Sequence, residues 1–282
     1  MKKEYSIRVP VHSTPLDHLG RVQRDEDIKI IVYGGVPDSP LNGGRFNTAL
    51  NGFVVKGRFL LSITKEQLAR ATACFFAAME EANRQHLSFY LAFTNLFISP
   101  EELNARNLEP LDRLVECGDR YGVKNGLILA NQLLEDHIRR KYGGRLTYSS
   151  SCTKYVSPQR ILTPRETLAM YLEDSAKYDY VCVTPQDSRR EAQLRAVLKD
   201  SKCGIIAISN SYCAFNCNSY YHYRDMSRKN KKSVVDIGTV ELLADALAFM
   251  LPRLTTCTAM RHSFCKLKTD ELAAMQLKAG ID

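Results

Sequence analysis

Cys213 and Cys217 are the residues of this sequence whose type and spacing best suit chemistry. They are separated by three residues in the segment SNSYCAFNCN, residues 209–218, so two thiolates in one turn can reach the same metal ion. Cys257 and Cys265 follow later in the chain and complete a set of four thiol ligands. Iron–sulfur clusters and zinc both accept four thiolates. We expect a 4Fe-4S cluster, because soft irons prefer sulfur ligands, and zinc is the alternative.

Cys152 is a further thiol in a chemically suggestive place, in the segment SSSCT directly after a predicted strand. It competes with the four other cysteines for a ligand place or faces the substrate, so it is a candidate catalytic residue. His222, shortly after the cysteine pair, is the second catalytic candidate. The alternative for His222 is a hydrogen-bonded structural histidine.

Polar side chains near these thiols are candidate substrate-binding groups. Tyr221 and Arg224 belong to a polar aromatic run that can stack on, and hydrogen-bond to, a planar or acidic substrate. Asn131 and Asn210 are neutral amides near predicted strand ends, where they either position a substrate or form turns. The basic residues that cluster after the cysteine pair are either a solvated loop or a contact for phosphate or an acidic substrate.

The other cysteines have a simpler interpretation. Nine cysteines, an odd number in a chain of 282 residues, favour metal or redox chemistry over a disulfide framework. Four of them lie in apolar or helical surroundings, and we expect them to be buried as small hydrophobic residues. These four are Cys74, Cys117, Cys182 and Cys203.

Strands and helices alternate along the chain. Runs rich in Val, Ile and Leu predict six strands, at 28–33, 87–93, 125–130, 145–150, 179–183 and 204–209. Helical spacing and caps predict helices at 64–84, 110–120, 133–141, 163–177, 189–198 and 239–251, with a short one after Ser99. Thr64 and Gln67 form a predicted capping box at the start of the first helix.

This alternation predicts a single domain, 1–282, with an α/β fold: a TIM-barrel-like parallel β/α barrel. A barrel is favoured over a doubly wound sheet because no glycine-rich dinucleotide fingerprint follows the first predicted strand. Polar residues fall just past strand ends, where barrel enzymes hold their chemistry, and the cysteine pair follows the sixth strand. Because the sequence stops at Gly280-Ile281-Asp282, where another strand is expected, the barrel is incomplete at this end or completed by a partner protein.

Composition and missing motifs exclude several classes of protein. The chain is 45% hydrophobic and 25% charged, which suits a folded core. It has no apolar run long enough to cross a membrane and no apolar signal core, so we expect a cytoplasmic protein without a membrane partner. A net charge of +8 attracts acidic partners without identifying a nucleic-acid binder. The motifs of α/β-hydrolases, zinc proteases and P-loop enzymes are absent from the sequence.

Four segments resemble the collagenase-like peptidase family, peptidase family U32. They are VYGG at 32–35, LAN at 129–131, SSCT at 150–153 and the stretch from Asn210 to Cys217. The resemblance includes the iron–sulfur members linked to oxygen-independent hydroxylation of ubiquinone precursors and RNA. It implies a barrel with cysteines at its mouth and, in several members, a 4Fe-4S cluster, with Cys213 and Cys217 as the matching ligands. The family tail resembles residues 264–282, but its usual further strand with a basic residue is missing here.

Three functions follow as hypotheses. The first is an iron–sulfur enzyme that modifies a small molecule or RNA, with hydroxylation as the expected reaction. The second is a hydrolase of peptide bonds, as the family label implies. The third is a non-catalytic subunit with a structural cluster or zinc, whose barrel is completed by a partner.

Overall fold

The computed structural model describes residues 6–11, 15–26, 28–42, 64–155 and 162–208, and the backbone of a hairpin at 54–55 and 58–59. Contacts divide these residues into two compact units, one up to Tyr148 and one from Ser149 onward. Each unit is described by itself below. A single domain over 1–282 stays a prediction.

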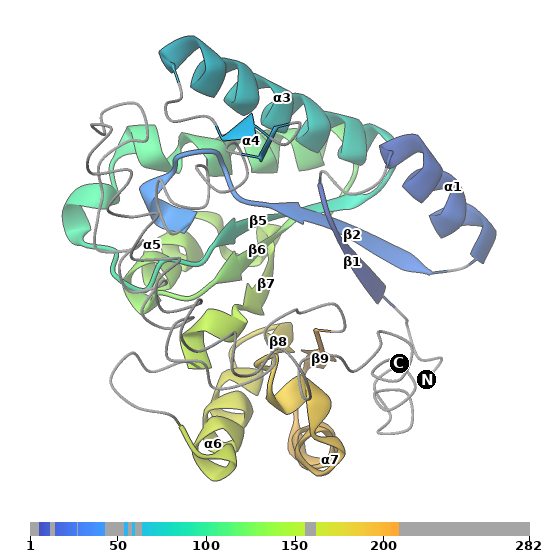
Figure 1. The fold of residues 1–282 in the computed structure, drawn as a ribbon, viewed down its shortest axis with the longest axis vertical. Helices are drawn as coiled ribbons and strands as arrows, with labels where there is room; N and C mark the ends of the chain where they lie inside the picture. Colours follow the sequence, from blue (N-terminus) through green and yellow to red (C-terminus); the bar gives the residue numbers. More distant parts are fainter. Residues whose placement is uncertain are drawn as a thin grey trace. The chain divides into compact units, whose positions relative to one another are not determined.

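The first unit is built on parallel strands. β1 (Ser6–Pro10), β2 (Lys29–Gly34), β5 (Ser88–Phe93) and β6 (Gly126–Leu129) pair in that order (Figure 1). β7 (Thr147–Ser150) joins β6 where the Thr147 amide donates to the Asn125 carbonyl at 2.9 Å. A separate antiparallel pair consists of β3 (Val54–Val55) and β4 (Arg58–Phe59).

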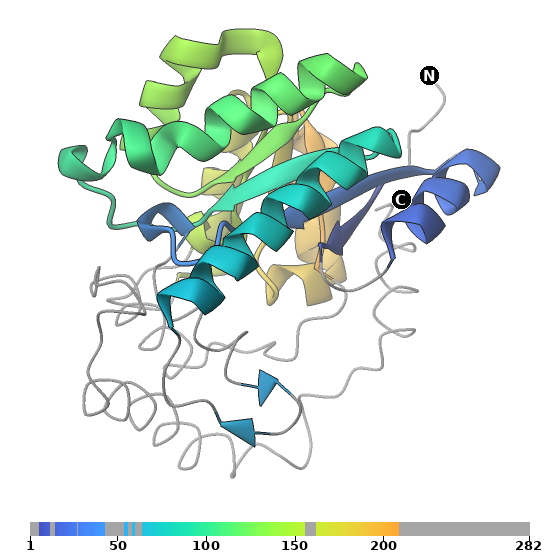
Figure 2. The same ribbon diagram turned by 90° about the horizontal axis from the view of Figure 1, so that it is seen from above.

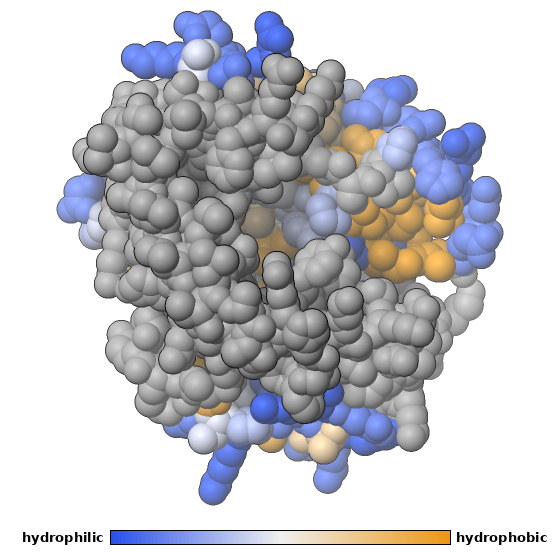
Figure 3. Space-filling view, in the orientation of Figure 1, coloured by the Kyte–Doolittle hydropathy of each residue, from blue (hydrophilic) through white to orange (hydrophobic). Residues whose placement is uncertain are grey.

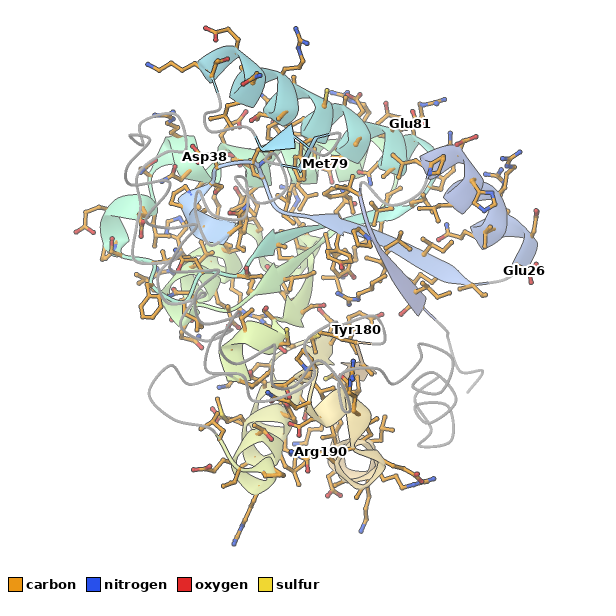
Figure 4. The ribbon with its side chains drawn as sticks, viewed as in Figure 1. Glu26, Asp38, Met79, Glu81, Tyr180 and Arg190 are labelled. Atoms are coloured by element: carbon orange, nitrogen blue, oxygen red, sulfur yellow. The ribbon has the colours of Figure 1, made fainter. Side chains whose placement is uncertain are left out.

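Helices cover one face of these strands (Figure 1). The helices are α1 (Leu16–Glu26), α3 (Lys65–Arg84), α4 (Ala105–Tyr121) and α5 (Gln132–Tyr142). The α3 ring of Phe75 packs edge-on against Phe89 of β5, with centroids 5.6 Å apart. In Figure 4, Met79 of α3 points toward the strands, and it is buried, whereas Glu81 is part of the solvent-facing side. The parallel strands are therefore buried as a β/α arrangement requires.

Ionic and cation–π contacts join neighbouring helices of the first unit. Figure 2 shows α3 and α4 running side by side. The Arg120 guanidinium lies 2.9 Å from Glu80, and the Arg113 guanidinium lies 4.5 Å from the centre of the Phe76 ring. The Arg120–Glu80 ion pair is exposed and therefore contributes little to stability.

Several predicted helix ends are confirmed, and one is wrong. Thr64 caps α3 with the predicted capping box, and Ser99 precedes a short 3-10 helix, η2 (Pro100–Glu102). α4 begins five residues before the predicted start, because Asn104 caps it by accepting from the Asn107 amide at 3.1 Å. Pro110 therefore lies inside the helix. The other 3-10 turns of this unit are η1 (Pro40–Asn42) and η3 (Gly143–Arg145).

The second unit continues the parallel order. The end of β7 pairs with β8 (Tyr180–Cys182), and β8 pairs with β9 (Gly204–Ile206). Its helices, α6 (Pro164–Ser175) and α7 (Glu191–Asp200), lie side by side in Figure 1. Two 3-10 turns follow the strands: η4 (Cys152–Tyr155) after β7 and η5 (Asp187–Arg189) after β8.

The predicted fold class, a TIM-barrel-like parallel α/β fold, is confirmed. The strand order β1-β2-β5-β6-β7-β8-β9 follows the order of the chain, and the pairs β1–β2, β2–β5, β5–β6, β7–β8 and β8–β9 are parallel. A doubly wound sheet would instead reverse its strand order at a switch point. Among the described strands this order has two ends, β1 and β9, as in an incomplete barrel.

The outer side chains of β1 are partly uncovered. Ile7 is 51% exposed, and Figure 3 shows apolar surface on the side where Figure 1 draws β1 and β2. None of the described helices combines the length and apolar character needed to span a membrane.

Candidate active site at the carboxyl ends of β7, β8 and β9

Three loops of the second unit begin at the same edge of its strands. Ser151 and η4 follow β7, the segment from Val183 to Arg190 follows β8, and Ala207 and Ile208 follow β9. Because the three strands are parallel, their carboxyl ends meet at one edge. Barrel enzymes place their reacting groups at this edge.

The turn after β7 carries Cys152, the first residue of η4, which is half-buried. The turn is closed locally: the Lys154 amide donates to the Ser151 carbonyl at 2.9 Å, and the Thr153 amide donates to the Ser151 hydroxyl at 3.2 Å. Ser151 and Thr153 are buried, so the backbone on both sides of the thiol is fixed in the interior.

Tyr155, the last residue of η4, attaches this turn to α6. It is buried, and its hydroxyl lies 2.8 Å from Oδ2 of Asp174 and 2.6 Å from the Ser150 hydroxyl. The Lys154 ammonium lies 2.9 Å from the other oxygen of Asp174. Burial, with the charge of Asp174, raises the pKa of Tyr155 far above its usual range. The phenol therefore stays protonated and donates to the carboxylate.

Tyr171 of α6 holds the loop after β8 in a similar way. Its hydroxyl lies 2.7 Å from Oδ2 of Asp187 and accepts from the Thr184 amide at 3.0 Å. The Thr167 hydroxyl donates to the same Asp187 oxygen at 2.8 Å. Burial, followed by the charge of Asp187, raises the pKa of Tyr171 as well. Asp187 is thus a buried carboxylate held mainly by neutral donors.

Ser188 connects this loop to the chain that leaves β9. The side chain is fully buried; its hydroxyl donates to the Thr184 carbonyl at 2.9 Å and accepts from the Ile208 amide at 3.0 Å. Figure 4 shows where this loop lies, between Tyr180 on β8 and Arg190 at the start of α7. The direction in which the chain leaves β9 is therefore set by a buried side chain of the neighbouring loop.

Two of the predicted site residues lie in the described part of the chain, Asn131 and Cys152. Asn131 belongs to the first unit and caps α5: its Oδ1 accepts from the Leu134 amide at 3.0 Å, and its Nδ2 donates to the Leu96 carbonyl at 2.9 Å. Both ends of the amide hold backbone groups, and its role in substrate binding stays a prediction. The remaining predicted residues fall outside the described residues: Asn210, Cys213, Cys217, Tyr221, His222, Arg224, Cys257 and Cys265.

The cysteines predicted to be buried differ among themselves. Cys117 is buried, and burial raises the pKa of its thiol. Cys182 and Cys203 are half-buried, and burial raises the pKa of the Cys203 thiol too. Cys74 is exposed, so its predicted burial was wrong: it lies on the solvent side of α3, whose core side is marked by Phe75 and Met79. The described residues hold no group of three or more metal-binding side chains.

Sequence reasoning missed the residues that organise this edge. Tyr155, Tyr171, Asp187 and Ser188 were absent from the predicted site. A signal was present in the polar residues Thr184, Asp187 and Ser188 directly after a predicted strand. The partners of Thr184 and Asp187 on α6 lie 13 to 20 residues away in the chain, and no local pattern reveals such pairings.

Comparison with known proteins gives likenesses of fold at low identity. No protein-family model and no curated protein matches the chain. A solved U32 peptidase is 14% identical with a TM-score of 0.47, over 84% of this chain and 82% of that one. A D-allulose 3-epimerase from Methylomonas sp. is 12% identical with a TM-score of 0.43, over 89% and 87% of the two chains. An L-ribulose 3-epimerase is 10% identical with a TM-score of 0.43, over 93% and 89%. Likenesses at this level assign neither an activity nor a substrate to this chain.

Proposed function

We propose that this chain is an enzyme that works at the carboxyl ends of β7, β8 and β9 with a 4Fe-4S cluster held by cysteine thiolates. The observation that carries the proposal is the hydrogen bond from the Ile208 amide to the buried Ser188 hydroxyl. It holds the chain at the carboxyl edge of the second unit, at the point from which the sequence continues to Cys213 and Cys217.

Chain length limits how far the first of these thiols can be from that edge. Cys213 comes five residues after Ile208, so its Cα lies within roughly 18 Å of the fixed point even if the chain is fully extended. Cys152 begins the turn after β7, at the same edge of the same unit. This limit on the distance of Cys213 from Ile208 supports the proposal that Cys213 and Cys152 belong to one site.

The proposed ligands are cysteine thiols, the sulfur donors that iron–sulfur clusters require. Cys152 is a soft sulfur donor, half-buried at the strand edge, in the kind of setting where thiolates bind iron. The cluster, when bound, supplies one-electron redox chemistry. The residues proposed to hold it are Cys213, Cys217, Cys257 and Cys265, with Cys152 competing for a place.

The substrate in this proposal is a small molecule or RNA, and oxygen-independent hydroxylation is the reaction that the family resemblance implies. Asn210, Tyr221 and Arg224 are the proposed substrate contacts, and His222 and Cys152 the proposed catalytic residues. Asn131 lies in the first unit, where its side chain holds the Leu134 and Leu96 backbone groups, and its role in substrate binding stays a prediction.

Iron and sulfide analysis after anaerobic purification tests the proposal. We expect a brown protein with about four irons per chain, the number in a cubane cluster. Cys213→Ser should remove most of this iron. The matched control is Cys74→Ser, which changes an exposed thiol of α3 and should leave the iron unchanged. A colourless zinc protein, or equal iron in the Cys213→Ser variant and its control, would refute the cluster or this ligand.

A further inference from the structure

One face of α6 supports two segments that lead to thiols. Asp174 and Tyr171 are three residues apart, one turn of the helix, and both are buried. Asp174 receives Tyr155 and Lys154 from the turn after β7. Tyr171 reaches Asp187 in the loop after β8. A single rigid helix is therefore bonded to both segments.

The two attachments are also in direct contact with each other. The rings of Tyr155 and Tyr171 pack edge to face, with centroids 4.6 Å apart and planes at 77°. Both residues are at most 1% exposed. Aromatic pairs in this geometry resist independent rotation of either ring, because each fills the space beside the other. Phenylalanine at either position keeps the ring, so a Tyr-to-Phe change leaves this contact in place and removes only the bonds of the hydroxyl.

Each attachment leads to a different thiol-bearing part of the chain. Tyr155 ends the turn that Cys152 begins. Tyr171 fixes Thr184 and Asp187, and the Ser188 hydroxyl of the same loop holds the Ile208 amide. The route from α6 to the chain before Cys213 consists of the buried bonds of Tyr171 and Ser188 to Thr184 and the partly buried bond from the Ile208 amide to Ser188, and all of them lie within the second unit.

We propose that Tyr155 and Tyr171 are positioning residues: Tyr155 orients the Cys152 turn, and Tyr171 orients the chain that leaves β9 toward Cys213. This inference rests on the proposed function only in taking these thiols as parts of one site. A purely structural role would loosen the whole unit when either hydroxyl is removed. A positioning role loosens one thiol-bearing segment selectively.

Alkylation of the full-length protein separates these two roles. The rate at which iodoacetamide modifies each cysteine is followed by mass spectrometry of the peptides, in the protein as purified and after iron removal by a chelator. Tyr155→Phe should accelerate modification of Cys152 about ten- to a hundredfold, the effect on local opening of losing one buried hydrogen bond to a charged group. Tyr171→Phe should act chiefly on Cys213 and Cys217. The rate at Cys74, on exposed α3, serves as the internal reference.

The matched control is Tyr142→Phe, which removes the same kind of bond, 2.7 Å from a tyrosine hydroxyl to Asp112, in the first unit. It should change none of these rates. Lys154→Met, which loosens the Cys152 turn while keeping the Tyr155 hydroxyl, provides a second test if Tyr155→Phe folds poorly. Lys154→Met should also increase the rate at which iodoacetamide modifies Cys152.

Two results would overturn the inference. One is an unchanged Cys152 rate in both Tyr155→Phe and Lys154→Met. The other is an equal acceleration of Cys152, Cys182 and Cys203, the half-buried thiols of the second unit, which indicates loosening of the whole unit. Selective acceleration in iron-free protein supports positioning even if the purified chain contains no iron, which would refute the proposed cluster alone.

Discussion

The Tyr171 hydroxyl lies 2.7 Å from Oδ2 of Asp187, and this contact joins α6 to the loop after β8 across 16 residues of sequence. The Asp187 side chain is 3% exposed, whereas its cationic neighbour Arg190 is 47% exposed and no closer than 3.4 Å. A buried carboxylate is costly unless hydrogen bonds replace its water. The hydrogen bonds from Tyr171 and Thr167 therefore replace the water that the buried Asp187 carboxylate has lost.

Replacing Tyr171 with Phe should cost about 2–3 kcal/mol of unfolding free energy, because it removes a donor to a buried charge and an acceptor of the Thr184 amide. Urea unfolding followed by circular dichroism measures the loss. Tyr142→Phe is the comparison, since Asp112 is 47% exposed and keeps Lys141 and water; it should cost about 1 kcal/mol or less. Equal losses in the two variants would mean that burial of the carboxylate does not matter.

Alkaline pH should destabilise the second unit through Tyr155 and Tyr171. The pKa of each is raised in the folded protein, chiefly by burial. The unfolded chain loses these protons near pH 10 and the folded one does not, so the folded state binds more protons above that pH. The stabilising contribution is therefore complete below about pH 10 and is lost progressively as pH rises toward the folded pKa values.

Each of these tyrosines should add about 1.4 kcal/mol per pH unit to the alkaline decline of stability. Urea unfolding at several pH values from 9 upward measures the slope, to which Tyr155 and Tyr171 together should contribute about two protons in the wild type. Tyr155→Phe and Tyr171→Phe should each remove about one proton from it, because phenylalanine does not titrate. An unchanged slope in both variants would show that the phenols already ionise in the folded protein.

The sequence predicted much of the fold because its signals are local. The strands at β2 and β5 and the capping box at Thr64 each depend on a few adjacent residues. β1 and α1 were missed, because β1 carries Arg8 and Pro10 in place of a continuous apolar run. α4 was started too late because Pro110 is typical of a first turn, while the stronger signal was the cap at Asn104.

The candidate site was less predictable for a physical reason. Cys152 after β7 was found from its position past a strand. Tyr155 and Tyr171 were not found, because each bonds to a carboxylate on another element. In the sequence alone they look like ordinary core residues. Asn95, a buried amide after β5, likewise acts through partners that its position does not reveal: it donates to the Pro40 carbonyl and accepts from the Phe97 amide.

Gly126 should tolerate no side chain, because Tyr90 of the neighbouring strand covers it. A Cβ at Gly126 would lie 2.6 Å from the Tyr90 ring and 2.7 Å from the Thr147 carbonyl oxygen, closer than carbon atoms approach. Gly126→Ala should cost about 1–3 kcal/mol by overpacking. Gly144→Ala is the control, since nothing lies within 4 Å of its Cβ position. Thermal unfolding compares the two, and equal midpoints would contradict the packing of Tyr90 over β6.

The last prediction concerns Asn83 and Asn125, a buried pair in the first unit. Asn83 donates to Asn125 Oδ1 at 2.8 Å, and Asn125 donates back to Asn83 Oδ1 at 2.6 Å. Asn125 Oδ1 also accepts from the Phe89 amide of β5, and its Nδ2 donates to the Leu114 carbonyl of α4. The pair therefore joins α3, α4 and β5 through buried polar groups, which are destabilising when left without partners.

Replacing Asn125 with Ala should cost about 3–4 kcal/mol, because it leaves the Phe89 amide and one end of Asn83 buried without partners. Asn83→Ala should cost about 2–3 kcal/mol. The double variant should lose about 1–2 kcal/mol less than the sum, since the mutual bonds are removed once. Urea unfolding of the four proteins measures this coupling, with Asn104→Ala, an exposed helix cap, as a control that should add independently. Strict additivity for Asn83 and Asn125 would show that the two amides stabilise the protein separately, contrary to the geometry.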